Sequence, residues 1–183
     1  MRSLQKDTGR LILKAVLFSA IAAIVIIADR IAKNLAVELL KPIENYPLWK
    51  GVFELTFCTN YGAAFSILSN QRWLLIAVTA VAMLFILVAG VIYRKASYWF
   101  FLSLGMICGG GAGNMIDRIA AGYVVDFFDF TLINFPVFNV ADVFICVGAA
   151  LLLIDVIFIE KEEVFSHKSK KAKESATDIV DNN

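Results

Sequence analysis

The chain has 183 residues, of which 60% are hydrophobic and 18% are charged, which makes it far more apolar than a soluble domain with about 45–50% apolar residues. Its formal net charge is +1, so no strong overall field indicates nucleic acid as a partner. The single histidine, His167, lies in a polar C-terminal stretch, which excludes a Ser-His-Asp triad, a Cys-His pair and an H-E-x-x-H metal site from the apolar part.

Four apolar segments are suited to crossing a bilayer, which requires roughly 20 residues of helix. The predicted spans are 11–28, 73–93, 99–115 and 140–159. Lys14 lies close enough to the start of the first span to snorkel. A cleaved signal peptide is the alternative for this span, but no A-x-A site follows it, and Asp29-Arg30-Ile31-Ala32-Lys33 continues the helical pattern. We therefore expect a retained first helix.

The lysines and arginines predict the orientation, because cytoplasmic loops hold the excess of these residues. They gather before the first span, between the second and third spans, and after the fourth, and include Arg10, Arg94, Lys95 and Lys161. Both termini are therefore predicted to be cytoplasmic. Residues 1–165 form the predicted membrane domain, and the polar tail 166–183 is expected to be disordered in the cytoplasm.

The outward loop 41–70 has a pattern of its own. From Val52 to Thr59, large apolar residues alternate with polar or small ones, which is typical of a half-buried strand. Asn60-Tyr61-Gly62 supplies turn chemistry, and 63–68 is predicted to return as a second strand. The fold class is therefore an all-α integral membrane protein with four transmembrane helices and a small extracytoplasmic β-element between the first two. The alternative to the β-element is an irregular interfacial loop.

Ionisable residues near the hydrocarbon cost about 2.5–3.5 kcal/mol each, so they are functional or paired by default. With this topology, most of them collect at the outer membrane face. Asp29 and Lys33 are four residues apart, which favours a structural ion pair over a direct role. For Asp117 and Arg118, the alternative to a role in a site is a helix-end pair and an interfacial anchor. Asp155 lies about 20 Å along the helix from Asp142 and cannot share a site with it.

Asp126 and Asp142 differ from the other acids because each lies in a strongly apolar run. Desolvation favours the neutral form of a carboxyl, and a second carboxylate nearby makes double ionisation harder. Two such acids can share a proton, so that one activates water and the other protonates the leaving group, as in aspartic proteases. The alternative for an aspartate near a helix start is an ordinary cap or N-terminal charge.

Four sequence blocks resemble the lipoprotein signal peptidases, also called type II or prolipoprotein signal peptidases. The third block runs from Gly113-Asn114-Met115-Ile116-Asp117-Arg118 into Gly122-Tyr123-Val124-Val125-Asp126-Phe127. The others are Asp29-Arg30-Ile31-Ala32-Lys33, Asn60-Tyr61-Gly62-Ala63-Ala64-Phe65-Ser66 and Phe138-Asn139-Val140-Ala141-Asp142. All four occur in order on four spans, which makes the resemblance specific.

The resemblance implies an endopeptidase of the bacterial cytoplasmic (inner) membrane. Such an enzyme removes the signal peptide from diacylglyceryl-modified prolipoproteins by cutting just before the lipidated cysteine. It also implies that Asp126 and Asp142 are catalytic, and that no cofactor or metal is needed. The site-shaping and substrate-binding residues would be Asn60, Gly62, Asn114, Arg118 and Asn139, and the structural supports would be Asp29, Lys33 and Asp117. The expected partners are membrane lipid, lipidated precursors and the inhibitor globomycin, and the expected state is a monomer.

Two other classes of function are alternatives to the peptidase. A small transporter or channel would distribute acids through the depth of the bundle, whereas the second span has no ionisable residue between Trp73 and Tyr93. A non-catalytic assembly protein predicts that carboxamide replacement of both aspartates would be harmless. Cleavage of a lipidated precursor, with and without globomycin, distinguishes the three classes.

Overall fold

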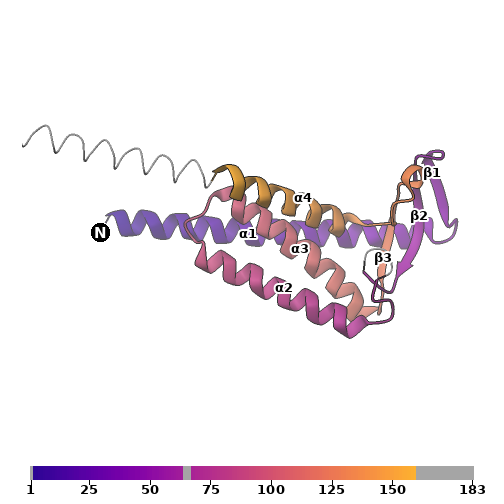
Figure 1. Ribbon diagram of the computed structural model, residues 1–183, viewed down its shortest axis with the longest axis horizontal. Helices are drawn as coiled ribbons and strands as arrows, with labels where there is room; N and C mark the ends of the chain where they lie inside the picture. The colour runs from indigo at the N-terminus through magenta and orange to yellow at the C-terminus, as the bar shows by residue number, and fades with distance from the viewer. Residues whose placement is uncertain (1, 64–66, 160–183) are drawn as a thin grey trace, which may run out of the picture.

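The computed structural model describes residues 2–63 and 67–159. Within these residues, four long helices run side by side and a small sheet lies at one end of them (Figure 1). The helices are α1 (Arg2–Leu35), α2 (Arg72–Ile92), α3 (Tyr98–Ala120) and α4 (Val140–Ile154). The tail predicted to be disordered, 166–183, lies outside the described residues.

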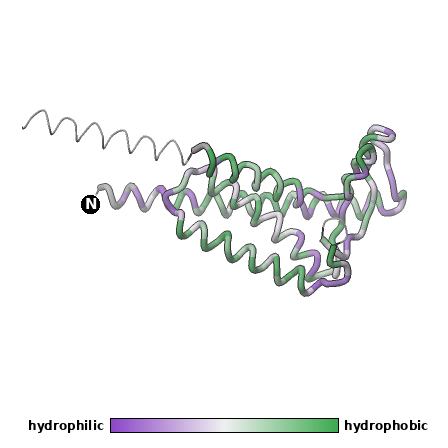
Figure 2. Tube along the Cα trace, viewed as in Figure 1, coloured by the Kyte–Doolittle hydropathy of each residue, from purple (hydrophilic) through white to green (hydrophobic). Residues whose placement is uncertain are grey.

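The helices are long and apolar enough to cross a membrane. Their most apolar windows have mean hydropathies of 2.7, 2.9, 1.3 and 2.5 for the spans that begin at Asp7, Arg72, Tyr98 and Val140, respectively. Figure 2 shows that hydrophobic residues fill the middle of the bundle and that hydrophilic residues gather towards its two ends. The predicted fold class, four membrane helices with a small β-element, is confirmed.

The central helix is α3, with 56% of its most apolar window buried against 6–17% for the other three helices. Its glycines allow the neighbouring backbones to come close. A Cβ added at Gly109 would lie 2.8 Å from the carbonyl oxygen of Ala22 on α1, and one at Gly110 would lie 2.5 Å from that of Ala141 on α4. Helices in lipid use small residues in this way because packing, not the hydrophobic effect, drives their association. Close packing on α3 thus sets the positions of α1 and α4.

The sheet in the described part of the chain has the strand order β1-β2-β3, with antiparallel pairing. Its strands are β1 (Asn45–Trp49), β2 (Phe53–Asn60) and β3 (Val124–Asp129). The predicted strand over 52–59 is confirmed as β2. Its predicted partner is wrong for Ile67 and Leu68, which lie in a turn, while residues 64–66 lie outside the described ranges. The third strand instead comes from the connection between α3 and α4, some 65 residues further along the chain.

A register shift interrupts the pairing of β2 with β3. Leu55 lies opposite Phe128, whereas Cys58 lies opposite Asp126. Three steps along β2 therefore correspond to two along β3, which is the signature of an extra residue on the longer strand. Beyond the shift, Asn60 lies opposite Val124, so Cys58, Asn60 and Asp126 share one face of the sheet.

At the sheet end of the bundle, the helices extend beyond the predicted spans. α1 continues through Lys33 to Leu35 and leads into a π-helical turn, η1 (Ala36–Leu40), and α3 continues through Arg118 to Ala120. A short 3-10 turn, η3 (Thr131–Ile133), follows β3. A π-helical turn, η4 (Asp155–Ile159), follows α4 at the opposite end of the bundle. Asp29 and Lys33 are therefore inside a continuous helix, where their side chains have a fixed direction.

At the opposite end, Lys14 does not snorkel as predicted. It is 7% exposed, and its ammonium donates to the carbonyl oxygens of Arg94, at 3.3 Å, and Ala96, at 2.5 Å. These carbonyls follow the C-terminus of α2, where backbone acceptors lack helical partners. Lys14 thus joins α1 to the α2–α3 connection.

Candidate active site

Asp126 and Asp142 reach one cavity from two different elements. Asp126 lies in the middle of β3 and is 2% exposed. Asp142 lies in the first turn of α4 and is half-buried. Both line a cavity of about 460 Å³ at the sheet end of the bundle, together with Asn60, Asn114, Arg118 and Asn139. The structure therefore brings together the two predicted catalytic residues and four of the five predicted site-shaping residues.

Two asparagines connect the carboxylates. The Asn139 side chain is fully buried, and its Nδ2 donates to Asp126 Oδ1 at 2.6 Å and to Asn114 Oδ1 at 3.1 Å. Asn114 Nδ2 in turn donates to Asp142 Oδ1 at 2.8 Å. An amide carries both donors and an acceptor, so each asparagine can serve two partners. The two carboxylates are thereby held in one network.

Asn139 also begins α4. Its Oδ1 accepts from the backbone N–H of Asp142 at 3.0 Å, and Asp142 Oδ2 accepts from the backbone N–H of Asn139 at 3.2 Å. This is a reciprocal capping box, which satisfies backbone donors that a helix start leaves unpaired. The expected cap role of Asp142 is therefore present in addition to its place in the cavity, and the second carboxylate oxygen of Asp142 and the amide nitrogen of Asn139 remain directed at the network.

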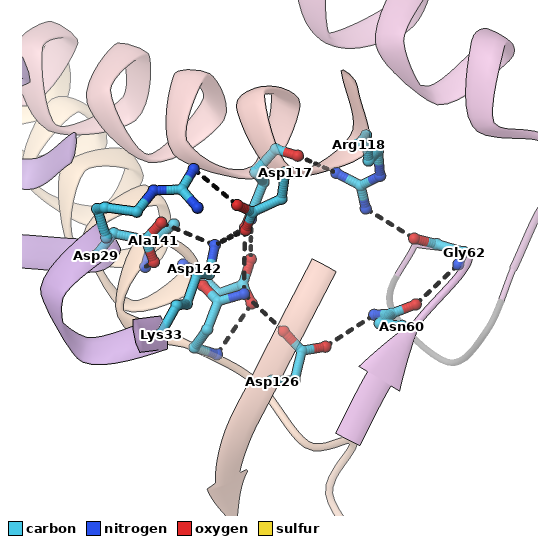
Figure 3. Close-up of polar contacts among 12 residues, drawn as sticks. Asp29, Lys33, Asn60, Gly62, Asp117, Arg118, Asp126, Ala141 and Asp142 are labelled. Atoms are coloured by element: carbon cyan, nitrogen blue, oxygen red, sulfur yellow. Dashed lines mark hydrogen bonds and ion pairs between the residues drawn. The ribbon is translucent and has the colours of Figure 1, made fainter. Parts of the chain in front are cut away.

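The outer wall of the cavity is joined to Asp126 through the end of β2 (Figure 3). Asn60 Nδ2 donates to Asp126 Oδ2 at 2.9 Å, and Asn60 Oδ1 accepts from the backbone N–H of Gly62 at 2.8 Å. Arg118 Nη2, from α3, donates to the carbonyl oxygen of Gly62 at 2.7 Å. Gly62 thus contributes only its backbone groups, and it is the one predicted site-shaping residue that is not among those lining the cavity.

A buried ion cluster contacts Asn114, and three of its members, Asp29, Lys33 and Asp117, are labelled in Figure 3. Lys33 Nζ, from α1, lies 2.7 Å from Asp29 Oδ2 and 2.7 Å from Asp117 Oδ2, and it donates to Asn114 Oδ1 at 2.8 Å. Arg30 makes a second ion pair with Asp117 at 2.8 Å. Asp29 Oδ1 accepts from the backbone N–H of Ala141 at 3.0 Å. The cluster therefore ties α1, α3 and the start of α4 together behind the cavity.

Burial raises the pKa of Asp126 to about 6, from an ordinary value of 3.8. The nearby charge of Asp142 acts in the same direction, and the hydrogen bonds from Asn60 and Asn139 oppose it. Burial also raises the pKa of the Cys58 thiol, and the charges of Asp126 and Asp129 add to this effect. A protonated thiol is a poor nucleophile, so the cavity is suited to carboxyl chemistry rather than to thiol chemistry.

In the described parts of the chain, no group of three or more His, Cys, Asp or Glu side chains is arranged to hold a metal ion. Two other acids, Asp129 and Asp155, are not among the residues that line the cavity. Asp155 accepts from Ser97 Oγ at 2.6 Å at the far end of the bundle, and Asp129 accepts from Thr56 Oγ1 at 2.9 Å on the sheet.

Comparison with known proteins decides the family. The family model of signal peptidase (SPase) II matches residues 21–158. The chain belongs to the signal peptidase II family. Curated relatives named lipoprotein signal peptidase include those of Brevibacillus brevis, 47% identical over 74% of this chain and 91% of the relative, and of Halothermothrix orenii, 45% identical over 73% and 90%. A Lactococcus lactis relative is 38% identical over 79% of this chain and 96% of its own.

Solved structures agree with this assignment. Two structures described as a bacterial membrane enzyme superpose with TM-scores of 0.68 and 0.67 at 27% identity. They cover 75% and 76% of this chain, and 85% and 91% of their own chains. This protein is thus a bacterial integral membrane protein and a signal peptidase II, an aspartic peptidase that removes signal peptides from prolipoproteins.

Three features of this signal peptidase II site were not predicted from the sequence. The segment from Phe135 to Phe138 forms part of the cavity wall, as do Cys58 and Cys146. Arg30 belongs to the ion cluster, although its place in the first sequence block was the only signal for it. Asp117 was expected to pair with Arg118, but it pairs with Lys33 and Arg30 instead.

Proposed function

We propose that Asp126 and Asp142 are the catalytic pair of this signal peptidase II. The observation that supports this most strongly is that the two carboxyl groups line one cavity and are linked through Asn139 and Asn114. A buried carboxyl whose pKa lies near 6 is suited to proton transfer close to neutral pH.

In the proposed mechanism, the two aspartates hold one proton between them. The ionised member removes a proton from a water molecule as the water oxygen bonds to the scissile carbonyl carbon. The protonated member then gives its proton to the amide nitrogen as the C–N bond breaks, which releases a carboxylic acid and an amine. Because the pair titrates jointly, the proton is assigned to the pair and not to one residue.

The proposed substrates are diacylglyceryl-modified prolipoproteins, cleaved just before the lipidated cysteine. Asn60, Asn114, Asn139 and Arg118 carry amide and guanidinium donors at the cavity, and such groups can orient a peptide backbone. Gly62 shapes the site through its backbone bonds to Asn60 and Arg118. The supporting residues are Asp29, Lys33 and Asp117, because their charges fix the helices that carry the asparagines.

The proposed function also implies an orientation of the protein in the membrane and an oligomeric state. Arg10 belongs to the N-terminal part of α1, and Arg94 and Lys95 belong to the α2–α3 connection. Figure 1 shows these segments at the end of the bundle opposite the sheet, so we infer that this end is cytoplasmic and that the cavity faces outward. A lipidated substrate would then reach the cavity from the outer leaflet. One chain supplies every residue of the proposed site, which supports a monomer. Globomycin is proposed to compete for the same cavity.

The test uses the purified full chain in liposomes with a lipidated precursor, and cleavage is followed by mass spectrometry. Asp126→Asn and Asp142→Asn, made separately, should each reduce the cleavage rate by about 10²–10⁴-fold. Asp129→Asn is the matched control, because it removes a carboxylate from the same strand outside the cavity. Globomycin should inhibit the wild type, and an unlipidated precursor should not be cut. Cleavage at the wild-type rate by either cavity variant would refute the assignment.

A further inference from the structure

A basic recess lies at the end of the bundle opposite the active site. It has a volume of about 540 Å³ and is lined by Arg10, Lys14, Arg94 and Lys95, with Asp7 as the acidic residue among its lining. The first two cations belong to α1, and the other two belong to the α2–α3 connection. Four basic side chains against one acidic side chain give this recess a strong preference for an anion.

An apolar groove continues from the basic recess between α1 and α2. Its volume is about 290 Å³, and it shares Leu11 and Arg94 with the recess. Phe101 and Leu104 of α3, which are 5% and 2% exposed, form its floor. α1 and α2 both pack against α3, and across the described residues they make little direct contact with each other. The groove is therefore a furrow open towards the surrounding lipid.

The cations in the recess differ in what they already bind. Lys14 is buried against the rings of Tyr98 and Phe101 and donates to two carbonyls, so its head is occupied. Arg94 and Lys95 are exposed, as is Arg10. None of these three forms an ion pair with another described residue. Within the described ranges, no acidic partner occupies these three charges, and the bond from Lys14 to the Arg94 carbonyl fixes the backbone that carries two of them.

We propose that the recess and the groove together bind a phospholipid with an anionic headgroup. The groove matches an acyl chain in polarity and lies along the helices, and the recess places cations where the headgroup of that lipid would lie. Cations that only set the orientation of the protein in the membrane would not require an apolar groove beside them. Here the groove leads into the recess that holds the cations. The site goes beyond the proposed function because it contains no residue of the catalytic cavity. With the proposed orientation, the lipid belongs to the cytoplasmic leaflet.

The test is native mass spectrometry of the full chain, released from micelles that contain equal amounts of phosphatidylglycerol and phosphatidylcholine with identical acyl chains. The wild type should retain phosphatidylglycerol over phosphatidylcholine, and Arg94→Gln should lower that preference about fivefold, as expected for one cation at a lipid surface. Lys50→Gln is the matched control, because it removes a cation from the turn between β1 and β2 at the other end of the molecule. It should leave the preference unchanged.

A second variant tests the groove independently of charge. Gly90 lines the groove, and a Cβ added there would meet Leu104 and Phe101 at an ordinary 3.8 Å. Gly90→Leu should therefore fold, fill the furrow and lower retention of both lipids by about tenfold, which corresponds to the loss of about two buried methylene groups. Precursor cleavage, which the proposed catalytic pair supports, serves as the check on folding. Equal retention of the two lipids by the wild type, or an equal loss in Arg94→Gln and Lys50→Gln, would overturn the proposed site.

Discussion

Asp126→Asn is expected to reduce cleavage by about 10²–10⁴-fold and yet to stabilise the protein at neutral pH. The carboxylate is 2% exposed, and burial is the main cause of its raised pKa. The charged form is therefore less favourable in the folded protein than in the unfolded chain. A carboxamide of the same shape removes the charge but cannot exchange protons with water or substrate.

The magnitude follows from the difference between the pKa of about 6 in the folded protein and the ordinary value of 3.8. Between these values the folded state binds more protons than the unfolded state, so stability falls as pH rises through the window from about pH 4 to about pH 6. Below it, both states are protonated and there is no cost. At about 1.4 kcal/mol for each pKa unit, the cost above the window is about 3 kcal/mol. Asp126 accepts from the side-chain amides of Asn60 and Asn139, and a carboxamide has only one oxygen to accept these two bonds. The lost bond costs about 1 kcal/mol, which leaves a net gain of about 2 kcal/mol.

The assay is denaturant unfolding of the wild type and the variant in mixed micelles at pH 4 and pH 7.5. The gain should be present at pH 7.5 and absent at pH 4. Asp129→Asn is the control, because its carboxylate accepts a hydrogen bond from Thr56 that the carboxamide keeps only in part, so no gain is expected. If Asp126→Asn were less stable than the wild type at pH 7.5, or if its effect did not change with pH, the electrostatic reasoning would be wrong.

Four further substitutions test the support of the site. Asn139→Ala removes a helix cap and leaves the acceptor on Asp126 without its donor, so unfolding should become easier by about 2–4 kcal/mol; an unchanged unfolding midpoint would contradict this. Lys33→Met strips the buried carboxylates of their shared cation and should cost about 3–5 kcal/mol in the same unfolding assay, and full stability would refute it. Gly110→Ala should lower both the melting temperature and the cleavage rate, because the added Cβ would collide with α4. In Gly111→Ala the added Cβ would have its nearest neighbour at 3.6 Å, so this variant should stabilise α3 by about 0.5–1 kcal/mol. Equal effects of the two substitutions would refute the packing account.

The membrane helices and one strand could be predicted because their signals are local. A span shows itself as a run of apolar residues, and the alternation from Val52 to Thr59 indicates a strand without reference to its partner. The pairing of β2 with β3 could not be predicted in this way, because it joins segments far apart in the chain. The apolar run around Asp126 was recognised, but nothing within it identified Asn60 as a neighbour.

The side-chain partners were harder to predict than the residues themselves. Adjacent positions on a helix point about 100° apart, so Asp117 and Arg118 cannot face the same neighbour. Asp117 turns towards α1, and Arg118 turns towards the carbonyl of Gly62. Sequence spacing did identify the pair of Asp29 and Lys33, since residues four apart share a helix face.

The extra residue between Leu55 and Cys58 has a consequence for how this protein tolerates length changes. Side chains alternate along a strand, so the extra residue changes which positions of β2 lie on the same face as Asp126. Before it these are odd-numbered positions such as Leu55, and after it they are even-numbered positions such as Asn60. A chain one residue longer there, with the same pairing before it, would present Thr59 where Asn60 now stands. Insertions of a single residue should therefore be tolerated in the turn between β1 and β2, and should be damaging between Leu55 and Cys58.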